Sequence, residues 1–360
     1  MNTITYKVDN PVLHTTEELL DRSLPRPTVR QELVGELLQV LKEGLGDLGG
    51  HKRPLWISKA RFGEANLCKS FAVARSTKQF SWSQPAALGS IVDRAITVGL
   101  EKRRLSPKAC VESALSGIEL EGTDLARFLD TLGPEAKELL SGKAVELVGN
   151  LLECWPHFPP DNFDSQVVMK VYLSGAVVLR GTPDLVLGSL ASQDGCSRAL
   201  VLDWKTGQLR PEHALEQRFY ALLTTLWAGH PPWRVATYYL STQRCLIDEV
   251  SEELLFSTAA QVVEVAHLLN NAAFSEQLMD YSPGEYCAWC PTSSECPKDQ
   301  GTLSPEPPLG TGQLRGDLLL AADSLVKSLF SITEVGLALF EATVEVLLGG
   351  GKRTKEGAKG

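Results

Sequence analysis

Apolar residues recur every three or four positions through most of the first half of the chain, which is the period of an amphipathic helix. This spacing predicts helices over residues 16–21, 29–44, 84–101 and 122–153, the last of them broken at Gly133-Pro134. We therefore expect the N-terminal half to be mainly helical.

The pattern changes after residue 166, where short runs of Val and Leu are separated by Ser-Gly, Gly-Thr-Pro and Asp-Gly. Such runs predict a meander of strands. The strands are expected at 167–172, 176–179, 184–187 and 199–204, followed by a helix at 211–228, a strand at 234–240 and a helix at 251–271. This order predicts an α/β (α+β) fold, with a small mixed sheet flanked by helices, better than a doubly wound dinucleotide fold.

Pro and Gly are concentrated in residues 301–312, which predicts a linker. A helix over 313–348 and a disordered tail over 349–360 are expected beyond it, and residues 1–55 are expected to form an N-terminal helical segment. No uncharged apolar run of about 18 residues occurs, and the N-terminus lacks a signal-peptide pattern. These features predict a cytoplasmic protein with no membrane partner.

The composition, with 43% hydrophobic and 22% charged residues among 360, excludes a fibrous or wholly disordered chain. The net charge of -9 also argues against a strongly basic protein that coats nucleic acid. Residues 51–108, however, carry twelve Lys and Arg against three acids, or 12 - 3 = +9. This stretch either faces phosphates or is a solvated helix surface, and the sequence leaves both interpretations open.

The densest chemical signal is the sequence LVLDWKTG at 200–207, because strand alternation places Asp203 and Lys205 on one face. A second acid, Asp184, lies nineteen residues upstream in GTPDLV, at the start of a strand that can pair with the first. Two carboxylates can hold a divalent cation while a lysine stabilises a water or a developing phosphorane charge. A charge pair on an edge strand would give the same Asp-x-Lys string.

Three cysteines, Cys287, Cys290 and Cys296, are separated by two and five residues and suit a soft metal centre that lacks one ligand. The other five cysteines are isolated along the chain, and an isolated intracellular cysteine is usually a small buried apolar residue.

The order GTPDLV, a strand ending in DWKTG and then a helix resembles the RecB-like branch of the PD-(D/E)XK nuclease superfamily. The resemblance extends to CRISPR-adaptation and phage exonucleases. It covers residues 56–297, within a nuclease domain expected at 56–300, and implies that Asp184 and Asp203 bind Mg²⁺ or Mn²⁺ and that Lys205 is catalytic.

The segment WISKARFGEANLCKSF at 56–71 is similar to the serine-led segment that supplies the first cluster ligand in iron-sulfur members of that family. The resemblance implies that Cys68, Cys287, Cys290 and Cys296 hold a 4Fe-4S cluster that closes the domain. Four thiolates would satisfy zinc equally well, or could be reduced structural cysteines, and only the resemblance favours iron.

The sequence departs from the family pattern at two positions. The family's metal-binding histidine is replaced by Asp93, which can ligate a hard cation or, as a surface acid, pair with Arg94. The family's Gln-x-x-x-Tyr helix motif has Glu216 at the Gln position before Tyr220, with Gln217 one residue later. We predict Gln217 and Tyr220 as the further catalytic residues, with Gln217 taking the role of the family's glutamine.

These features together predict a metal-dependent DNA nuclease, an exonuclease on single strands or DNA ends, in recombination, repair or phage DNA processing. Trp82 and the basic stretch would guide a single strand. The C-terminal helix either docks on a helicase or recombinase partner or packs on its own domain, which we favour. The alternative is a catalytically inactive iron-sulfur subunit that binds DNA or a complex, and the retained Asp184, Asp203 and Lys205 argue against it.

Overall fold

The computed structural model describes most of the chain up to residue 296. The described residues are 12–21, 23, 29–48, 54–77, 80–102, 105–154, 163–173, 177–190, 199–271, 281–284, 286–287 and 290–296. They all belong to one compact unit, Met1–Gly301. The predicted linker, C-terminal helix and tail lie outside the described residues. Within the described ranges, no helix has the length and apolar character needed to cross a membrane.

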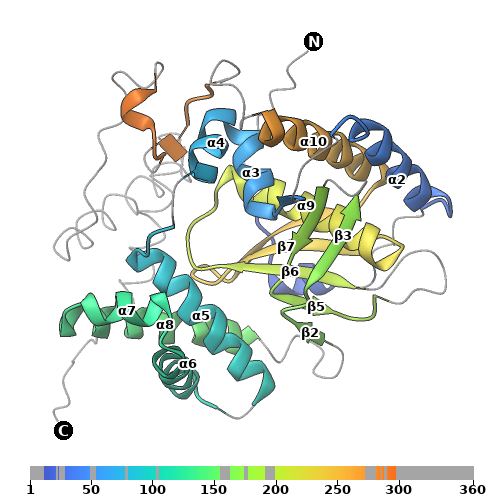
Figure 1. Cartoon of the computed structure of the whole chain (residues 1–360). Coiled ribbons are helices and arrows are strands. Elements are labelled where there is room, and N and C mark those ends of the chain that lie inside the picture. Colours follow the sequence, from blue (N-terminus) through green and yellow to red (C-terminus); the bar gives the residue numbers. More distant parts are fainter. Residues whose placement is uncertain are drawn as a thin grey trace, which may run out of the picture. The chain divides into compact units, whose positions relative to one another are not determined.

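Four consecutive helices form a block on one side of the domain (Figure 1). They are α5 (Gln84–Glu101), α6 (Pro107–Glu121), α7 (Asp124–Thr131) and α8 (Pro134–Cys154). Ser83, Ser106 and Thr123 cap α5, α6 and α7 by accepting a hydrogen bond from a first-turn backbone N–H, which fixes where each helix begins. The predicted 84–101 helix is confirmed, whereas α6 was not predicted although Ser106-Pro107 is a good helix start.

The larger sheet has five strands in the order β2-β5-β6-β7-β8, with β6 and β7 parallel and the other neighbours antiparallel. Its strands are β2 (Phe163–Ser165), β5 (Leu185–Leu187), β6 (Leu200–Lys205), β7 (Arg234–Tyr239) and β8 (Arg244–Glu249). The helix α9 (Pro211–Ala228) connects β6 to β7, as a parallel pair requires.

A second sheet of three strands has the order β1-β4-β3. It contains β1 (Leu55–Ile57), parallel to β4 (Val177–Gly181), and β3 (Met169–Leu173), antiparallel to β4. The single predicted meander is therefore wrong, because its four strands are shared between two sheets. The three strands that were not predicted include β1 and β2, which are only three residues long and too short to show an alternating pattern.

On the face of the larger sheet opposite the α5–α8 block, α9 contacts β6, β7 and β8, and the remaining helices pack on α9 or on its neighbours (Figure 1). They are α2 (Leu33–Gly44), α3 (Lys59–Leu67), α4 (Lys69–Thr77) and α10 (Glu252–Asn271), while the short α1 (Thr16–Leu20) contacts β8. α2 begins four residues later than predicted.

Two apolar clusters fill the space on the two faces of β6. Leu200, Leu202 and Trp204 pack with α5, α6 and α8, whereas Val201 packs with α3, α9 and α10. The alternation predicted for this strand is confirmed, and it places Asp203 on the same face as Val201, toward α3 and α9.

Candidate active site

Two aspartates meet where β5 and β6 pair. Asp184 directly precedes β5, and Leu185 of β5 is in register with Leu202 of β6. The Asp184 carboxylate oxygen Oδ2 accepts a hydrogen bond of 2.8 Å from the backbone N–H of Trp204, the residue after Asp203. The antiparallel register thus brings together the two acids that are nineteen positions apart in the sequence.

Asp203 is buried, and each of its carboxylate oxygens is paired with a lysine ammonium. Lys205 Nζ lies 2.7 Å from Asp203 Oδ2, and Lys59 Nζ, from the first residue of α3, donates a hydrogen bond to Asp203 Oδ1. Burial alone would raise the pKa of Asp203, but the charges of Lys59 and Lys205 outweigh it and lower the pKa. Asp203 is therefore ionised.

The pKa of Asp184 is shifted in the opposite direction. Burial and the negative charge of Asp203 raise its pKa well above the usual range, and the charge of Lys59 opposes this only in part. A carboxyl group held in this way loses its proton more readily when a cation is placed beside it.

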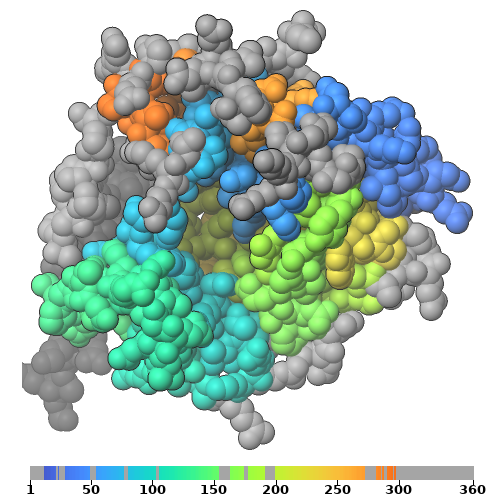
Figure 2. All heavy atoms as spheres, in the orientation of Figure 1, coloured from blue at the N-terminus to red at the C-terminus, as the bar shows by residue number. Residues whose placement is uncertain are grey.

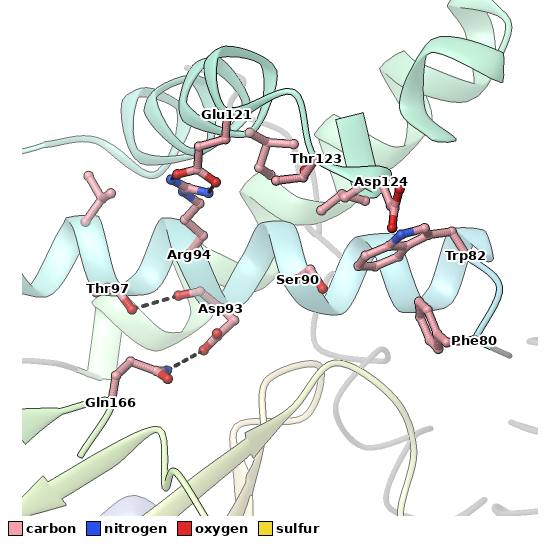
Figure 3. A pocket seen from close by; sticks show the side chains of 13 residues that line it. Phe80, Trp82, Ser90, Asp93, Arg94, Thr97, Glu121, Thr123, Asp124 and Gln166 are labelled. Carbon is pink, nitrogen blue, oxygen red and sulfur yellow. Dashed lines mark hydrogen bonds and ion pairs between the residues drawn. The ribbon is translucent and has the colours of Figure 1, made fainter. Parts of the chain in front are cut away.

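Asp93 faces this pair from α5. Its Oδ1 accepts a hydrogen bond of 3.0 Å from the Gln166 side chain, while Arg94 points to the opposite side and pairs with Glu121 (Figure 3). Burial raises the pKa of Asp93, the nearby Trp204 indole lowers it, and the charge of Asp203 raises it. The structure therefore brings Asp93 to the acids and does not pair it with Arg94.

The helix α9 supplies Glu216 to the site instead of Gln217. Glu216 Oε2 lies 2.6 Å from Lys205 Nζ, whereas the Gln217 side chain donates a hydrogen bond of 2.9 Å to the Leu246 carbonyl in β8. The hypothesis that Gln217 takes the role of the family's glutamine is not supported by this placement. Its amide would have to leave a buried hydrogen bond to reach the acids.

Tyr220 lies one helical turn beyond Glu216 and also borders the site. Its hydroxyl donates a hydrogen bond of 2.8 Å to the Thr182 carbonyl, and Lys59 Nζ lies 5.1 Å from its ring centre. A Cβ atom at Gly181 would come within 2.8 Å of the Tyr220 ring, so only glycine allows this close approach. Tyr220 thus fixes the loop that carries Asp184.

The assembled site has an excess of negative charge. Four carboxylates (Asp93, Asp184, Asp203, Glu216) and two ammonium groups (Lys59, Lys205) give a formal charge of 2 - 4 = -2 when all are ionised. That excess matches one divalent cation. Among the described residues, however, no three His, Cys, Asp or Glu side chains are already arranged around a common metal position.

Sequence reasoning missed two members of this cluster. Glu216 had a usable signal, because it holds the family's glutamine position relative to Tyr220. Lys59 had none, since it lies 144 positions from Asp203 and only the packing of α3 on α9 brings it into the site.

A groove leads along α5 away from Asp93. The surface is hollowed between the α5–α8 block and the strands (Figure 2), and a cavity of about 710 Å³ lies against α5, α6 and α7. Asp93 and Gln166 are at one end of this groove and the Phe80–Trp82 pair is at the other, as Figure 3 shows. The two rings stack edge to face with centres 5.0 Å apart.

The basic stretch 51–108 is not a continuous free cationic surface. Lys59, Arg75, Arg94 and Lys108 pair with carboxylates of the same chain, at Asp203, Glu64, Glu121 and Glu112. Four of its twelve basic residues are therefore paired within the domain, and five others (Lys52, Arg53, Lys78, Arg103 and Arg104) lie outside the described residues.

The four predicted cluster cysteines share one small pocket. Cys68, at the C-terminal end of α3, lines it together with Cys287, Cys290 and Cys296, which flank the 3₁₀ turn η4 (Ser293–Glu295). The pocket has a volume of about 20 Å³.

Tyr286 and Phe71 shield this cysteine pocket. Their rings stack with centres 5.6 Å apart, and the Tyr286 hydroxyl donates a hydrogen bond of 3.1 Å to the Leu67 carbonyl. Burial, and the negative charge that Cys68 and Cys287 carry when ionised, raise the pKa of Tyr286.

The isolated cysteines behave as expected where they are described. Cys110 and Cys245 are buried in the core of the α5–α8 side, and burial raises the pKa of Cys245 to about 12. The Cys154 side chain and Cys196 lie outside the described residues.

Comparison with known proteins agrees with this geometry. No curated protein matches the chain. The family model of the PD-(D/E)XK nuclease superfamily matches residues 70–297, which is more than half of the chain and includes Asp93, Asp184, Asp203 and Lys205 but not Lys59 or Cys68. The mixed α/β fold is consistent with that superfamily. The chain therefore belongs to the PD-(D/E)XK nuclease superfamily.

Proposed function

We propose that this protein is a metal-dependent DNA nuclease of the RecB-like, iron-sulfur type. Its substrates would be single strands or DNA ends, which it would cleave as an exonuclease during recombination, repair or phage DNA processing. The observation that carries the proposal is the placement of Asp184, bonded to the Trp204 backbone, next to Asp203 and Lys205 inside the matched nuclease domain.

Nucleases of this superfamily typically use Mg²⁺ or Mn²⁺, and the donor set fits such an ion. Asp184 and Asp203 would hold the cation and Asp93 would add a third carboxylate, in a cluster whose formal charge is -2 when its four carboxylates are ionised. The cation would supply an activated water and stabilise the charge that develops on the phosphate.

Two side chains of the protein, Lys205 and Tyr220, would act beside the cation. Lys205, held between Asp203 and Glu216, would orient the attacking water and stabilise the negative charge of the transition state. Tyr220 would keep the Asp184 loop in place through its bond to the Thr182 carbonyl.

The groove along α5 supports a path for a single strand. Its aromatic end, Phe80 and Trp82, would stack with bases, and its other end opens at Asp93. Because the groove also carries Glu121 and Asp124, its lining suits uncharged base edges better than phosphates.

The cysteine pocket supports the iron-sulfur part of the proposal. Four thiols that come from positions 68 and 287–296 line one shielded cavity, so a 4Fe-4S cluster there would join the start of the domain to its end. Zinc remains the alternative metal for the same four thiolates.

The test is an anaerobic purification followed by metal analysis and digestion of end-labelled DNA. We expect iron and sulfide in the preparation, and cleavage of single-stranded DNA or DNA ends only when Mg²⁺ or Mn²⁺ is added. Asp203→Asn should bind DNA without cutting it. If the wild-type protein binds DNA but cuts no substrate with either metal, the inactive-subunit alternative replaces this proposal.

A further inference from the structure

Lys59 holds a position in the site that the family comparison does not assign. It lies outside the matched residues 70–297, yet its ammonium bonds one oxygen of Asp203 while Lys205 pairs with the other. Each oxygen of this carboxylate is therefore already in contact with an ammonium group, and a cation that binds Asp203 would compete with one of them for the same oxygen.

Lys205 is the harder of the two to displace. Its ammonium also lies 2.6 Å from Glu216 Oε2, and its backbone is part of β6, two residues from Asp203. Moving it would leave Glu216 without an ammonium and Asp203 with Lys59 alone.

The Lys59 side chain can move away from Asp203 more readily than the Lys205 side chain can. Its backbone is at the first residue of α3, a separate element, and its side chain is 26% exposed. The Lys59 ammonium already lies 5.1 Å from the centre of the Tyr220 ring, and this cation–π contact can hold it when it leaves Asp203. Burial lowers the pKa of Lys59, but the charges of Asp203, Asp184 and Glu216 outweigh it, so the group stays charged.

We propose that Lys59 is a resident cation of the active site, which neutralises Asp203 while no metal is bound and is displaced from it when the divalent cation binds. The proposal rests on the nuclease function proposed above. Lys59 acts here as a positioning residue, since it keeps the buried carboxylates in place for the metal and competes with it for the same oxygen.

Competition between Lys59 and the metal predicts the direction in which the Mn²⁺ affinity changes when Lys59 is replaced. Without Lys59 the metal need not break an ion pair, so Lys59→Met should bind Mn²⁺ more tightly, by about tenfold for a lost competing interaction of about 1.4 kcal/mol. The same variant should melt at a lower temperature than the wild type in EDTA, because only one ammonium group remains beside its four carboxylates. When Mn²⁺ is added, its melting temperature should rise by more than that of the wild type.

The experiment is a Mn²⁺ titration of the full chain, with free Mn²⁺ followed by electron paramagnetic resonance and a parallel melting curve at each concentration. Lys59→Arg keeps the charge and should return the Mn²⁺ affinity toward the wild-type value. Lys170→Met makes the same change at an exposed lysine on β3 and should leave the affinity unchanged. If Lys59→Met does not fold, Lys59→Gln, which retains a polar contact to Asp203, replaces it.

Wild-type Mn²⁺ affinity in Lys59→Met or Lys59→Gln, or a weaker one, would overturn the proposal while leaving the nuclease function intact. A wild-type protein that binds no Mn²⁺ at all would overturn both. A tighter affinity that Lys59→Arg reverses supports the proposal, because a lysine that only supported the fold would weaken metal binding when removed.

Discussion

Replacement of Lys205 by Met tests whether the ammonium between two carboxylates acts in the chemical step. Its Nζ lies 2.7 Å from Asp203 and 2.6 Å from Glu216, and the side chain is 19% exposed. Met keeps the volume of the side chain and removes its charge, which takes the formal charge of the site from -2 to -3.

The change should affect both stability and rate. Removal of one partner from a buried ion pair costs about 3 to 5 kcal/mol, and partial exposure and the remaining Lys59 should reduce this to about 2 to 3 kcal/mol. That loss corresponds to about 4 to 12 °C in melting temperature for a domain of this size. Loss of a group that stabilises transition-state charge should slow cleavage about 10²- to 10³-fold.

The assay is single-turnover cleavage of end-labelled single-stranded DNA at saturating Mn²⁺, below the melting temperature of the variant, with DNA affinity measured by fluorescence anisotropy. The rate should fall while the affinity changes little, because the groove residues are untouched. Lys170→Met is the matched control and should cleave at the wild-type rate. Cleavage at the wild-type rate by Lys205→Met, even with a lowered melting temperature, would show that Lys205 only balances charge.

Three further predictions concern the metals and the acids. Cys68→Ala should lose iron and sulfide by metal analysis, whereas Cys110→Ala should keep both; equal iron in the two would exclude Cys68 as a ligand. Burial and the charge of Asp203 raise the pKa of Asp184, so the folded state binds a proton at this carboxyl group more tightly than the unfolded state does. The contribution of Asp184 to stability is therefore present at low pH and is lost as the pH rises through the raised pKa. Asp184→Asn removes the destabilising buried charge, worth about 1 kcal/mol of unfolding free energy, so it should melt about 2 to 4 °C higher than wild type at pH 8 in EDTA. It should not cleave DNA. A lower melting temperature would contradict the burial argument. Asp93→Asn should need about tenfold more Mn²⁺ for half-maximal cleavage, the equivalent of about 1.4 kcal/mol of metal binding, and an unchanged requirement would return Asp93 to a structural role.

Local periodicity determined much of the fold from the sequence alone. The α5 helix over Gln84–Glu101 and the α9 helix over Pro211–Ala228 follow from apolar spacing, with proline in the first turn of each. The same reasoning placed Asp203 and Lys205 on one face of a strand, because alternation is a property of the strand itself. The superfamily assignment depended on these local strings and is confirmed by the family model, while the RecB-like branch stays a prediction.

What faces those residues was decided only by tertiary structure. The choice of Glu216 over Gln217 depends on which side of α9 meets β6, and the entry of Lys59 depends on the packing of α3 against α9. Periodicity fixes the direction of a side chain relative to its own helix or strand, but not the distance to a group far away in the chain. The charges that set the pKa of Asp203, and the cation that a metal would have to displace, therefore appear only when the elements are packed together.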